Sequence, residues 1–387
     1  MNRKLRMGMV GGGQGSFIGA VHRIAAAIDG HIELVCGAFS STAEKSLASG
    51  KELYLPENRI YADYKEMMEQ EKALPEGDRM DFVSIVTPNY MHFPPAKLAL
   101  ESGFHVVSDK PATFSLEEAK ELQALVESTG LIYALTHNYT GYPMVKEARH
   151  LVSSGTIGDI RKVVVEYPQG WLGVMLEQEG QKQAAWRTDP DKAGISNCMG
   201  DIGTHAENLA EYITGLQITE LCADLTAFGE GRTLDTDGNV LLRFNNGAKG
   251  VLHASQISIG EENAFKIYVY GDKGGLEWHQ MNPNTLLVKW PDRPVEIYRA
   301  GADHNYLSEA AMHNTRLPAG HPEGYLEAFA NLYRNFAMTL QARLDGRKPD
   351  ALDTDFPTIK DGVRGMAFVK NVVESSKSEQ KWYPFEV

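Results

Sequence analysis

The sequence has few cysteines and no long apolar stretch. Its three cysteines, Cys36, Cys198 and Cys222, are an odd number without Cys-x-x-Cys spacing. That pattern is typical of buried thiols in a reducing compartment, and it favours neither a disulfide framework nor a zinc site. No run of about 18 apolar residues predicts a membrane span, and the first residues lack the apolar core and cleavage site of a signal peptide. We therefore expect a cytoplasmic protein.

Negative charge outweighs positive charge, with 51 Asp and Glu residues against 38 Lys and Arg residues. The 387 residues carry a net charge of −13, and no block of lysine and arginine is present. We therefore expect neither nucleic acid nor a membrane as a partner. A hydrophobic content of 43% is typical of a globular protein, and the length suits two domains. We expect a first domain over residues 1–140 and a second over 141–387, with the helical segment 323–344 packing back on the first.

Short apolar segments alternate with amphipathic ones as far as residue 138. The strand-like segments are residues 5–11, 32–39, 81–87, 105–111 and 131–138, and the helical ones are residues 20–29, 42–53, 93–103 and 115–130. In the last of these helices, Ser115 and Glu118 form a capping box and Gly130 ends the helix. Nearly continuous apolar strands between helices predict a parallel sheet covered on both faces. The first domain is therefore predicted to be a doubly wound α/β fold of the dinucleotide-binding type.

Longer strand candidates replace this alternation after about residue 145. They are residues 160–168, 218–228, 239–244, 249–257, 264–271 and 284–290. Between residues 220 and 225 apolar and polar side chains alternate, as in a strand with one covered and one wetter face. The second domain is therefore predicted to be a mostly antiparallel sheet with helices packed on it.

A glycine-rich loop follows the first strand. Residues 11–19 read GGGQGSFIG, so that Gly11, Gly13 and Gly15 stand between a strand and a helix. Glycines there permit positive φ, let the backbone approach a pyrophosphate, and leave helix N-terminal amides pointing at it. The loop predicts a dinucleotide site; the alternative is a tight turn needed only for packing.

The end of the second strand bears on the choice of cofactor. An Asp or Glu at this point usually holds the ribose 2′-hydroxyl of NAD. Here Ser40 and Ser41 stand instead, the first carboxylate is Glu44, and Lys45 adds a positive charge. These residues favour NADP slightly over NAD. The two serines are equally consistent with a helix N-cap that has no role in cofactor binding.

Two further strand ends carry polar residues next to proline. Thr87, Pro88 and Asn89 follow one strand, and Asp109 and Lys110 end the next, just before a second proline. Both ends lie at the carboxyl edge of the predicted sheet, where doubly wound folds bind ligand. We therefore count these residues as candidate cofactor contacts. A lysine at such a position can also be a simple solvated side chain.

Three stretches together resemble the Gfo/Idh/MocA oxidoreductases, the family named for glucose-fructose oxidoreductase and inositol dehydrogenase. They are TPNYMH, DKPATFSLEEAKEL and AWRTDPDKAGISNCMGDIGTHAENLAEYITG. The family's usual Glu-Lys-Pro is Asp109-Lys110-Pro111 here, and its Asp-x-x-x-His pair is Asp201 and His205. His92, in the first stretch, is a further candidate cofactor-site residue that orders the loop, with a packing role as the alternative.

The resemblance extends over essentially the whole chain. It implies a Rossmann domain joined to an α/β domain with a large open sheet, and assembly into homodimers or homotetramers. It also implies hydride transfer between NAD or NADP and a hydroxyl-bearing carbon of a sugar or cyclic polyol. Two rivals remain: an NAD-dependent glycosidase of the same fold, and a sugar-sensing protein that binds nucleotide without turnover.

The Asp-x-x-x-His pair and the lysine suggest how such a reaction proceeds. The spacing i, i+4 places Asp201 and His205 on one face of a helix. Oxidation of an alcohol needs a base, and an imidazole titrates near neutral pH, so His205 is our candidate base. Lys110 would donate a hydrogen bond to the same oxygen, and Asp201 would orient His205 or bind a neighbouring hydroxyl. The alternative is a helix-terminal carboxylate with a satisfied histidine. No third ligand is evident, so no metal site is predicted.

Four further residues are candidates for contact with the sugar. Trp186 and Arg187 are the types of side chain that a polyhydroxylated substrate needs, although a core aromatic and a surface ion pair would look the same. Asn138 and Tyr139 lie where the chain enters the second domain. The family frequently has an arginine in this stretch, so the sequence leaves the shape of the sugar pocket open.

Overall fold

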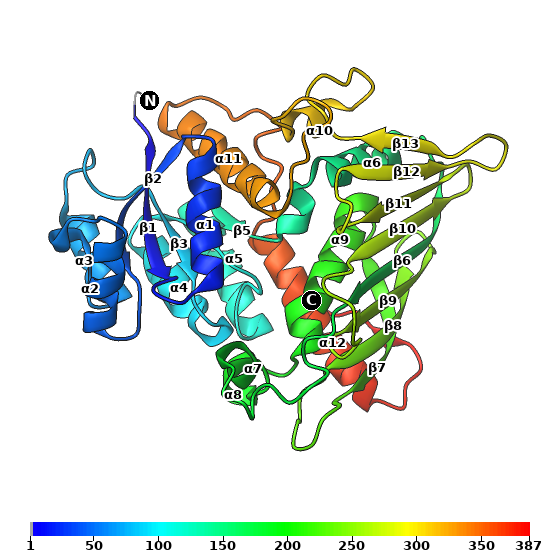
Figure 1. Cartoon of the computed structure of the whole chain (residues 1–387), viewed down its shortest axis with the longest axis horizontal. Helices are drawn as coiled ribbons and strands as arrows, with labels where there is room; N and C mark the ends of the chain where they lie inside the picture. The colour runs from blue at the N-terminus through cyan, green and yellow to red at the C-terminus, as the bar shows by residue number, and fades with distance from the viewer. Residues whose placement is uncertain (1–2) are drawn as a thin grey trace. The chain divides into compact units, whose positions relative to one another are not determined.

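The computed structural model describes residues 3–387, apart from the side chain of Lys182, and these residues form two compact units. Unit 1 comprises the chain up to Asn138 together with Tyr325–Val363, and unit 2 comprises Tyr139–Gly324 together with Arg364–Val387. Figure 1 shows the elements of both units in chain order, from blue at the N-terminus to red at the C-terminus.

Unit 1 is built on a parallel sheet. Its strands are β1 (Leu5–Gly11), β2 (Ile32–Ala38), β3 (Phe82–Val86), β4 (His105–Ser108) and β5 (Tyr133–Leu135), in the spatial order β2-β1-β3-β4-β5. The helices are α1 (Phe17–Ile28), α2 (Ala43–Glu52), α3 (Tyr64–Ala73), α4 (Phe93–Glu101), α5 (Leu116–Thr129) and α11 (Tyr325–Leu344). The chain passes from β1 to β2 on one side and then crosses back to place β3 on the other side of β1. The strand order therefore reverses at β1, and ligands bind at such a reversal in this class of fold.

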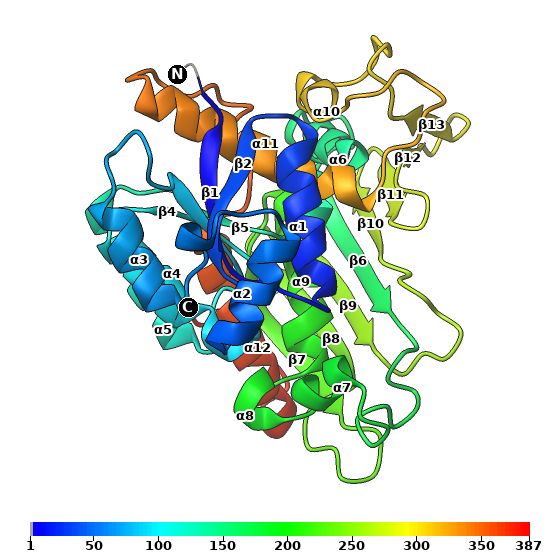
Figure 2. The same cartoon turned by 60° about the vertical axis from the view of Figure 1, so that its left-hand side comes forward.

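Helices cover both faces of this sheet, as Figure 2 shows for α1 and α11 on one side and α3, α4 and α5 on the other. One core joins the sheet to α1 and α11, and Phe336 of α11 stands 4.8 Å from Phe82 of β3 between ring centroids. The other core joins the sheet to α3, α4 and α5 through side chains such as Met67 and Leu122. The predicted doubly wound α/β fold is therefore confirmed.

Unit 2 is built on a large sheet, which contains nine strands within the described residues. Their order is β13-β12-β11-β10-β6-β9-β8-β7-β14, and every neighbouring pair is antiparallel except β6 and β9. The strands are β6 (Ile160–Pro168), β7 (Ile218–Thr226), β8 (Asp237–Phe244), β9 (Lys249–Ser255), β10 (Lys266–Gly271), β11 (Gly275–His279), β12 (Thr285–Lys289), β13 (Glu296–Arg299) and β14 (Tyr383–Pro384). The prediction of a mostly antiparallel sheet is confirmed, and β11, β13 and β14 are strands that the sequence pattern did not reveal.

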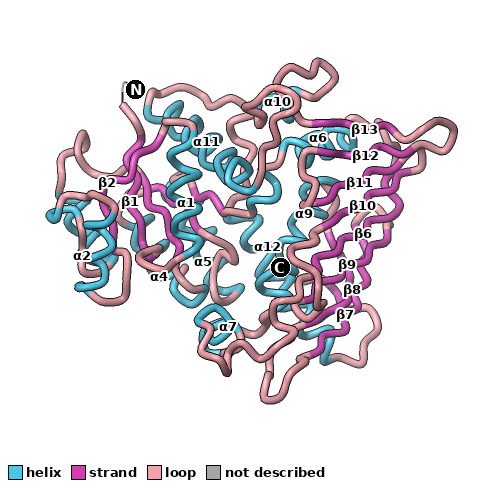
Figure 3. The backbone as a smooth tube through the Cα atoms, in the orientation of Figure 1, coloured by secondary structure: helices cyan, strands magenta, loops and turns pink. Residues whose placement is uncertain are grey.

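The helices of unit 2 are α6 (Pro143–Ser153), α7 (Lys182–Arg187), α8 (Pro190–Ala193), the π-helical turn η4 (Met199–Gly203), α9 (Thr204–Thr214), α10 (Glu309–His313) and the second part of α12 (Ile359–Lys377). Of these, α6 and α9 lie against one face of the sheet (Figure 3), and α10 packs on α6. Alternate residues such as Val163 and Val165 of β6 are fully buried beneath them, whereas Val164 between them is only half-buried. The opposite face of the sheet carries no helix of this unit. None of the helices in residues 3–387 is both long and apolar enough to cross a bilayer.

Candidate active site

The glycine loop connects β1 to α1 in unit 1. Gly12 and Gly15 have φ of 72° and 75°, a region that other residues rarely adopt. A Cβ on Gly12 would lie 3.1 Å from the Cα of Gly19, so the loop touches the helix directly. Gly13 donates its backbone N–H to the carbonyl of Phe39 at 3.1 Å, which ties the loop to the end of β2. A Cβ on Gly15 would meet no atom within 4 Å, so at Gly15 the loop is open to a phosphate beside a helix N-terminus.

An arginine that sequence reasoning missed supports this loop. Arg23, in α1, donates from Nη1 to the carbonyl of Gly12 at 2.6 Å. It therefore fixes a loop carbonyl and places a positive charge near the candidate pyrophosphate site. The signal available in the sequence was a basic residue just over one helical turn after Gly19.

The segment after β2 lies at the same edge of the sheet. Ser40 and Ser41 precede α2, and Thr42 is the N-cap of that helix. Neither serine is therefore the N-cap of α2, so the alternative that they serve only to cap this helix is wrong. Lys45 is exposed in the first turn of α2. Polar and basic groups are thus available where an adenosine ribose would lie in a fold of this class.

The segment after β3 forms a tight turn. Pro88 precedes the 3-10 turn η2 (Asn89–Met91), and Thr87 closes it by donating from Oγ1 to the carbonyl of Met91 at 2.8 Å. His92 follows the turn and is only 1% exposed. The predicted Thr87, Pro88, Asn89 and His92 are therefore brought together in one compact loop at the carboxyl edge of the sheet.

Lys110 follows β4 and is anchored through its neighbours. Its backbone N–H donates to Oδ1 of Asp109 at 2.8 Å, and Thr136, after β5, donates from Oγ1 to the same oxygen at 3.0 Å. The Lys110–Pro111 peptide bond is cis. Asp109 therefore fixes the backbone that carries Lys110 and joins it to the next strand.

Two buried polar residues follow β5. Asn138 is 2% exposed, and its side-chain nitrogen has no hydrogen-bond partner among residues 3–387. Leaving a buried donor unpaired costs about 1–3 kcal/mol, and a ligand oxygen that accepted this hydrogen bond would remove that cost. Burial, followed by the charge of Lys110, lowers the pKa of His137 to about 3, so this imidazole is neutral. Asn138 is thus well suited to contact a bound ligand.

In unit 2 the Asp-x-x-x-His pair lies across a change of helix type. Asp201 is in η4, and His205 is in the first turn of α9. The expected single α-helical face is therefore replaced by a π-helical turn that leads into an α-helix. Short π-helical segments are frequent at functional sites, because they re-aim side chains within a helix.

The carboxylate of Asp201 accepts two hydrogen bonds at Oδ2. Arg187 donates from Nε at 3.1 Å and Gln256 from Nε2 at 2.9 Å. Gln256 is completely buried, and its Oε1 accepts from Nδ2 of Asn197 at 2.9 Å. A cationic partner and a fixed amide therefore hold Asp201 as a carboxylate in a defined orientation.

A second carboxylate holds the turn itself. Asp235 accepts from the backbone N–H of Asn197 at 3.0 Å and from that of Met199 at 2.8 Å. Burial raises the pKa of Asp235, and these backbone bonds oppose that rise. Asn197, Asp235 and Gln256 were all missed at the sequence level. A polar residue inside an apolar segment, HASQIS, was the signal for Gln256.

Tyr139 belongs to a buried cluster of polar aromatic residues. Its ring stands edge-on to His205, with centroids 4.8 Å apart, and its hydroxyl bonds to the hydroxyl of Tyr167. Asn263 joins both hydroxyls, donating to Tyr139 at 3.1 Å and accepting from Tyr167 at 2.8 Å. Tyr139 was predicted as a substrate contact; the structure places it against His205.

Arg187 is flanked by aromatic rings. The guanidinium carbon lies 4.2 Å from the ring centroid of Trp186 and 5.8 Å from that of Trp171. Gln183 accepts from both the Trp186 indole, at 3.0 Å, and Arg187, at 2.6 Å. A charged group that donates to Asp201 therefore lies close to two aromatic rings, an arrangement that suits a polyhydroxylated ring.

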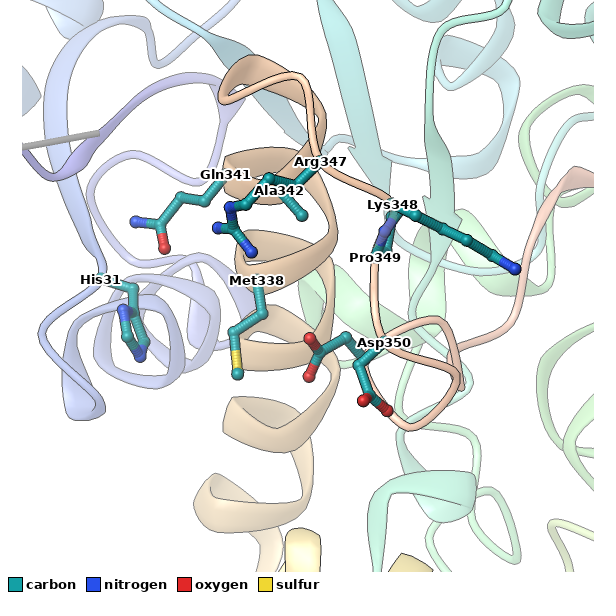
Figure 4. Close-up of a pocket in the computed structure, with 9 residues that line it drawn as sticks. His31, Met338, Gln341, Ala342, Arg347, Lys348, Pro349 and Asp350 are labelled. Carbon is teal, nitrogen blue, oxygen red and sulfur yellow. The ribbon is translucent and has the colours of Figure 1, made fainter.

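A cavity of about 400 Å³ lies elsewhere in unit 1. It is formed by α11, the loop after it and His31, which directly precedes β2 (Figure 4). His31 marks the amino end of the strands, opposite the edge that carries the candidate residues. None of the predicted site residues lines this cavity. Within the described part of the chain, no group of three His, Cys, Asp or Glu side chains is arranged to hold a metal ion.

The reversal of strand order at β1, the open glycine loop and the polar strand ends define unit 1 as a dinucleotide-binding domain. Residues 5–137 match the profile described as "Oxidoreductase family, NAD-binding Rossmann fold", and residues 145–277 match the "GFO/IDH/MocA C-terminal domain". The chain belongs to the Gfo/Idh/MocA family of oxidoreductases. It is therefore an enzyme that uses NAD or NADP, as the sequence predicted.

Three relatives show how far the similarity extends. The oxidoreductase YfiI of Bacillus subtilis is 34% identical over 392 residues, which cover 100% of this chain and 98% of YfiI. An inositol dehydrogenase homologue of Azotobacter vinelandii, solved with NAD+, is 35% identical to this chain with a TM-score of 0.93. The match covers 100% of this chain and 98% of the homologue. An inositol dehydrogenase homologue of this organism has also been solved with NADH and myo-inositol. Levoglucosan dehydrogenase of Pseudarthrobacter phenanthrenivorans is 25% identical over 74% of this chain and 76% of its own length.

Proposed function

We propose that the protein oxidises a secondary hydroxyl of a cyclic polyol or sugar, with NAD or NADP as the hydride acceptor. The observation that carries this proposal is the oriented Asp201 carboxylate next to His205, with Arg187 close to the rings of Trp186 and Trp171. The complex of one relative with myo-inositol, and the relative named for levoglucosan, support a substrate that is a ring bearing hydroxyl groups.

Each residue has a defined task in this proposal. His205 accepts the hydroxyl proton, and Lys110 donates a hydrogen bond to the oxygen as negative charge develops on it. Asp201, held by Arg187 and Gln256, orients the substrate or His205. The bound nicotinamide would take up the hydride. Asn138 supplies a buried donor at the carboxyl edge of unit 1, and the open face at Gly15 suits the pyrophosphate.

The test is growth of the nicotinamide absorbance band when purified protein is mixed with NAD+ or NADP+ and one compound at a time. The panel contains myo-inositol, other inositols, hexoses, levoglucosan and aryl glycosides. A dehydrogenase gives stoichiometric reduced cofactor and a ketone. Release of the aryl alcohol without net reduction would instead assign a glycosidase, and nucleotide binding without either product would assign a sensor.

Variants identify the residues that act in the reaction. His205→Asn and Lys110→Met should each lower kcat by about 10²–10⁴-fold, the usual contribution of a positioned acid or base. Turnover within tenfold of the wild type, a barrier change below about 1.4 kcal/mol, would remove the residue concerned from that role.

The same proposal includes assembly into homodimers or homotetramers through the uncovered face of the unit 2 sheet. One cross-strand row runs along this face through Ile297, Leu287, Glu277, Tyr268, Val164, Val251, Leu241 and Cys222. Leu241 and Ile297 are exposed although apolar. Light scattering should give a mass two or four times 42.8 kDa, and Leu241→Lys should reduce it. A monomeric wild type would contradict this assembly.

A further inference from the structure

His92 has an unusual pair of neighbours. The imidazole is almost completely buried, with Nδ1 2.6 Å from the carbonyl oxygen of Pro111 and Nε2 2.8 Å from the carbonyl oxygen of Thr87. Both distances are those of good hydrogen bonds. Pro111 follows Lys110 after β4, and Thr87 follows β3, so this single ring spans two loops at the carboxyl edge of the unit 1 sheet.

The chemistry of these neighbours determines the charge of the ring. A backbone carbonyl oxygen accepts hydrogen bonds but cannot donate one, and a neutral imidazole carries only one N–H. With a neutral ring, one nitrogen lone pair would face an oxygen lone pair at hydrogen-bond distance in a buried setting, where an unmade bond is costly. Both contacts are favourable only when both nitrogens carry a proton.

We infer that His92 is held as an imidazolium, donates to the carbonyls of Thr87 and Pro111 at once, and is a positioning residue that fastens the Thr87–Asn89 loop to the segment carrying Lys110. The inference rests on the proposed function, because it concerns the placement of Lys110. It assigns His92 an indirect role: its ring nitrogens bind the protein, and neither is directed at the cofactor.

The surrounding charges agree with this assignment. Lys110 is anchored on its N-terminal side by the carboxylate of Asp109, which accepts from the Lys110 backbone N–H. On its C-terminal side, the carbonyl of Pro111 is bound by His92. Asp109 and His92 both act electrostatically on His22 of α1, whose pKa burial lowers to about 4, so His22 is neutral. Asp109 is therefore the acidic residue of the same cluster and lies where it can balance a charge on His92.

The charge state is tested without substrate by nitrogen NMR of protein labelled with 15N-histidine, at about neutral pH. The His92 signals are assigned by their loss in His92→Gln or, if that variant does not fold, by contacts of the ring protons with Thr87 and Pro111 in the wild type. The expected result is two slowly exchanging N–H protons and two protonated nitrogens. A ring with one protonated nitrogen would overturn the inference, whatever the enzyme oxidises.

The positioning role is tested by steady-state kinetics. His92→Gln should lower kcat by about 10–100-fold, as expected when a supporting residue lets a reacting group move by about 1 Å, with the KM values for cofactor and sugar within about threefold of the wild type. His321→Gln, which changes an exposed histidine, is the control and should leave both constants unchanged. If His92→Gln changed only the KM for the cofactor, His92 would be a direct cofactor contact. If kcat were unchanged, His92 would have no role in the mechanism. Either result overturns the inference. If the wild type oxidises none of the compounds, the proposed function fails, but the NMR experiment still tests the charge of His92. Failure of the proposed function and failure of this inference are therefore distinguishable.

Discussion

The phenol ring of Tyr139 meets the imidazole of His205 edge-on, with an angle of 83° between the ring planes. The hydroxyl of Tyr139 is fixed by Tyr167 and Asn263, so the ring has little freedom to turn. Tyr139 and His205 both belong to unit 2. The buried cluster of Tyr139, Tyr167 and Asn263 therefore orients the imidazole of the candidate base.

Removing this ring should therefore weaken catalysis more than removing its hydroxyl. We expect Tyr139→Phe to keep kcat within about tenfold of the wild type, and Tyr139→Leu to lower kcat by about 100-fold. The sugar KM should change less than kcat in both variants. Unfolding by urea, measured alongside, separates loss of orientation from loss of fold. Equal activity of the two variants would contradict the role of the ring.

The open space at Gly15 predicts a specific loss of cofactor binding. Gly15 and Gly30 have φ of 75° and 72°, and a Cβ on either would meet no protein atom within 4 Å. Alanine at each site should therefore cost the same backbone strain, about 1–2 kcal/mol. Only Gly15→Ala should also weaken NADH binding, by tenfold or more in a fluorescence titration, because the cofactor would occupy that space. Equal affinity of the two variants would place the pyrophosphate elsewhere.

Arg187 should determine sugar affinity through its geometry rather than its charge alone. Arg187→Lys keeps a cation but loses the planar group that reaches both Asp201 and Trp186. The KM for the sugar should rise about tenfold. Arg243 is a matched control, because it also pairs with a carboxylate, Glu220 at 2.9 Å, and lies over a tryptophan ring at 3.7 Å. Arg243→Lys should leave KM unchanged, and a rise in that variant too would point to a general loss of stability.

Lys45 should contribute to the choice between the two cofactors. A positive charge near the 2′ position stabilises the phosphate of NADP and has nothing to act on in NAD. Lys45→Ala should therefore weaken NADPH binding by about five- to tenfold and leave NADH binding unchanged. Lys51, on the same helix, pairs with Glu57 at 2.8 Å, and Lys51→Ala serves as the control. Unaltered NADPH affinity in Lys45→Ala would indicate that NAD is the cofactor selected by this loop.

Acid should destabilise unit 1 through His105. Its Nδ1 accepts the backbone N–H of Ile132 at 2.9 Å, and burial lowers its pKa to about 4. The unfolded chain binds this proton near pH 6.5, so stability is complete above that pH and falls as the pH decreases toward 4, by up to about 3 kcal/mol. His105→Asn keeps an acceptor but does not titrate. Urea unfolding of the variant should show a correspondingly smaller decrease over this range, and an identical pH dependence would contradict the prediction.

Much of the fold was predictable because local and long-range signals agree. The helix α5 begins after Ser115, whose Oγ accepts from the Glu118 backbone at 3.2 Å, and ends at Gly130 with φ of 67°. The glycine loop and the apolar strands of unit 1 likewise carry their own signals. Helix α3 escaped prediction because only Met67, Met68 and Glu71 of its ten residues are buried, which leaves a weak periodic pattern.

The site was predictable only where a motif marks it. Asp201, His205 and Lys110 stand in recognisable stretches, but the start of η4 is also bound by Asp235, which is distant in sequence and accepts from two backbone amides. Arg23 and Gln256 look like ordinary residues of a helix and a strand until the chain is folded. Such supporting contacts join segments that no local pattern connects.

The composition of unit 1 from two separate stretches of chain has a consequence for synthesis on the ribosome. Phe336 and its neighbours in α11 complete the core against β3, yet they follow the whole of Tyr139–Gly324 in the sequence. Unit 2 likewise includes Arg364–Val387, so it cannot be completed before this segment has been synthesised. Neither unit can therefore finish folding until nearly the whole chain has emerged from the ribosome. Until then the nascent polypeptide exposes apolar strands. Chaperones that shield such strands should therefore bind the largest apolar surface late in translation.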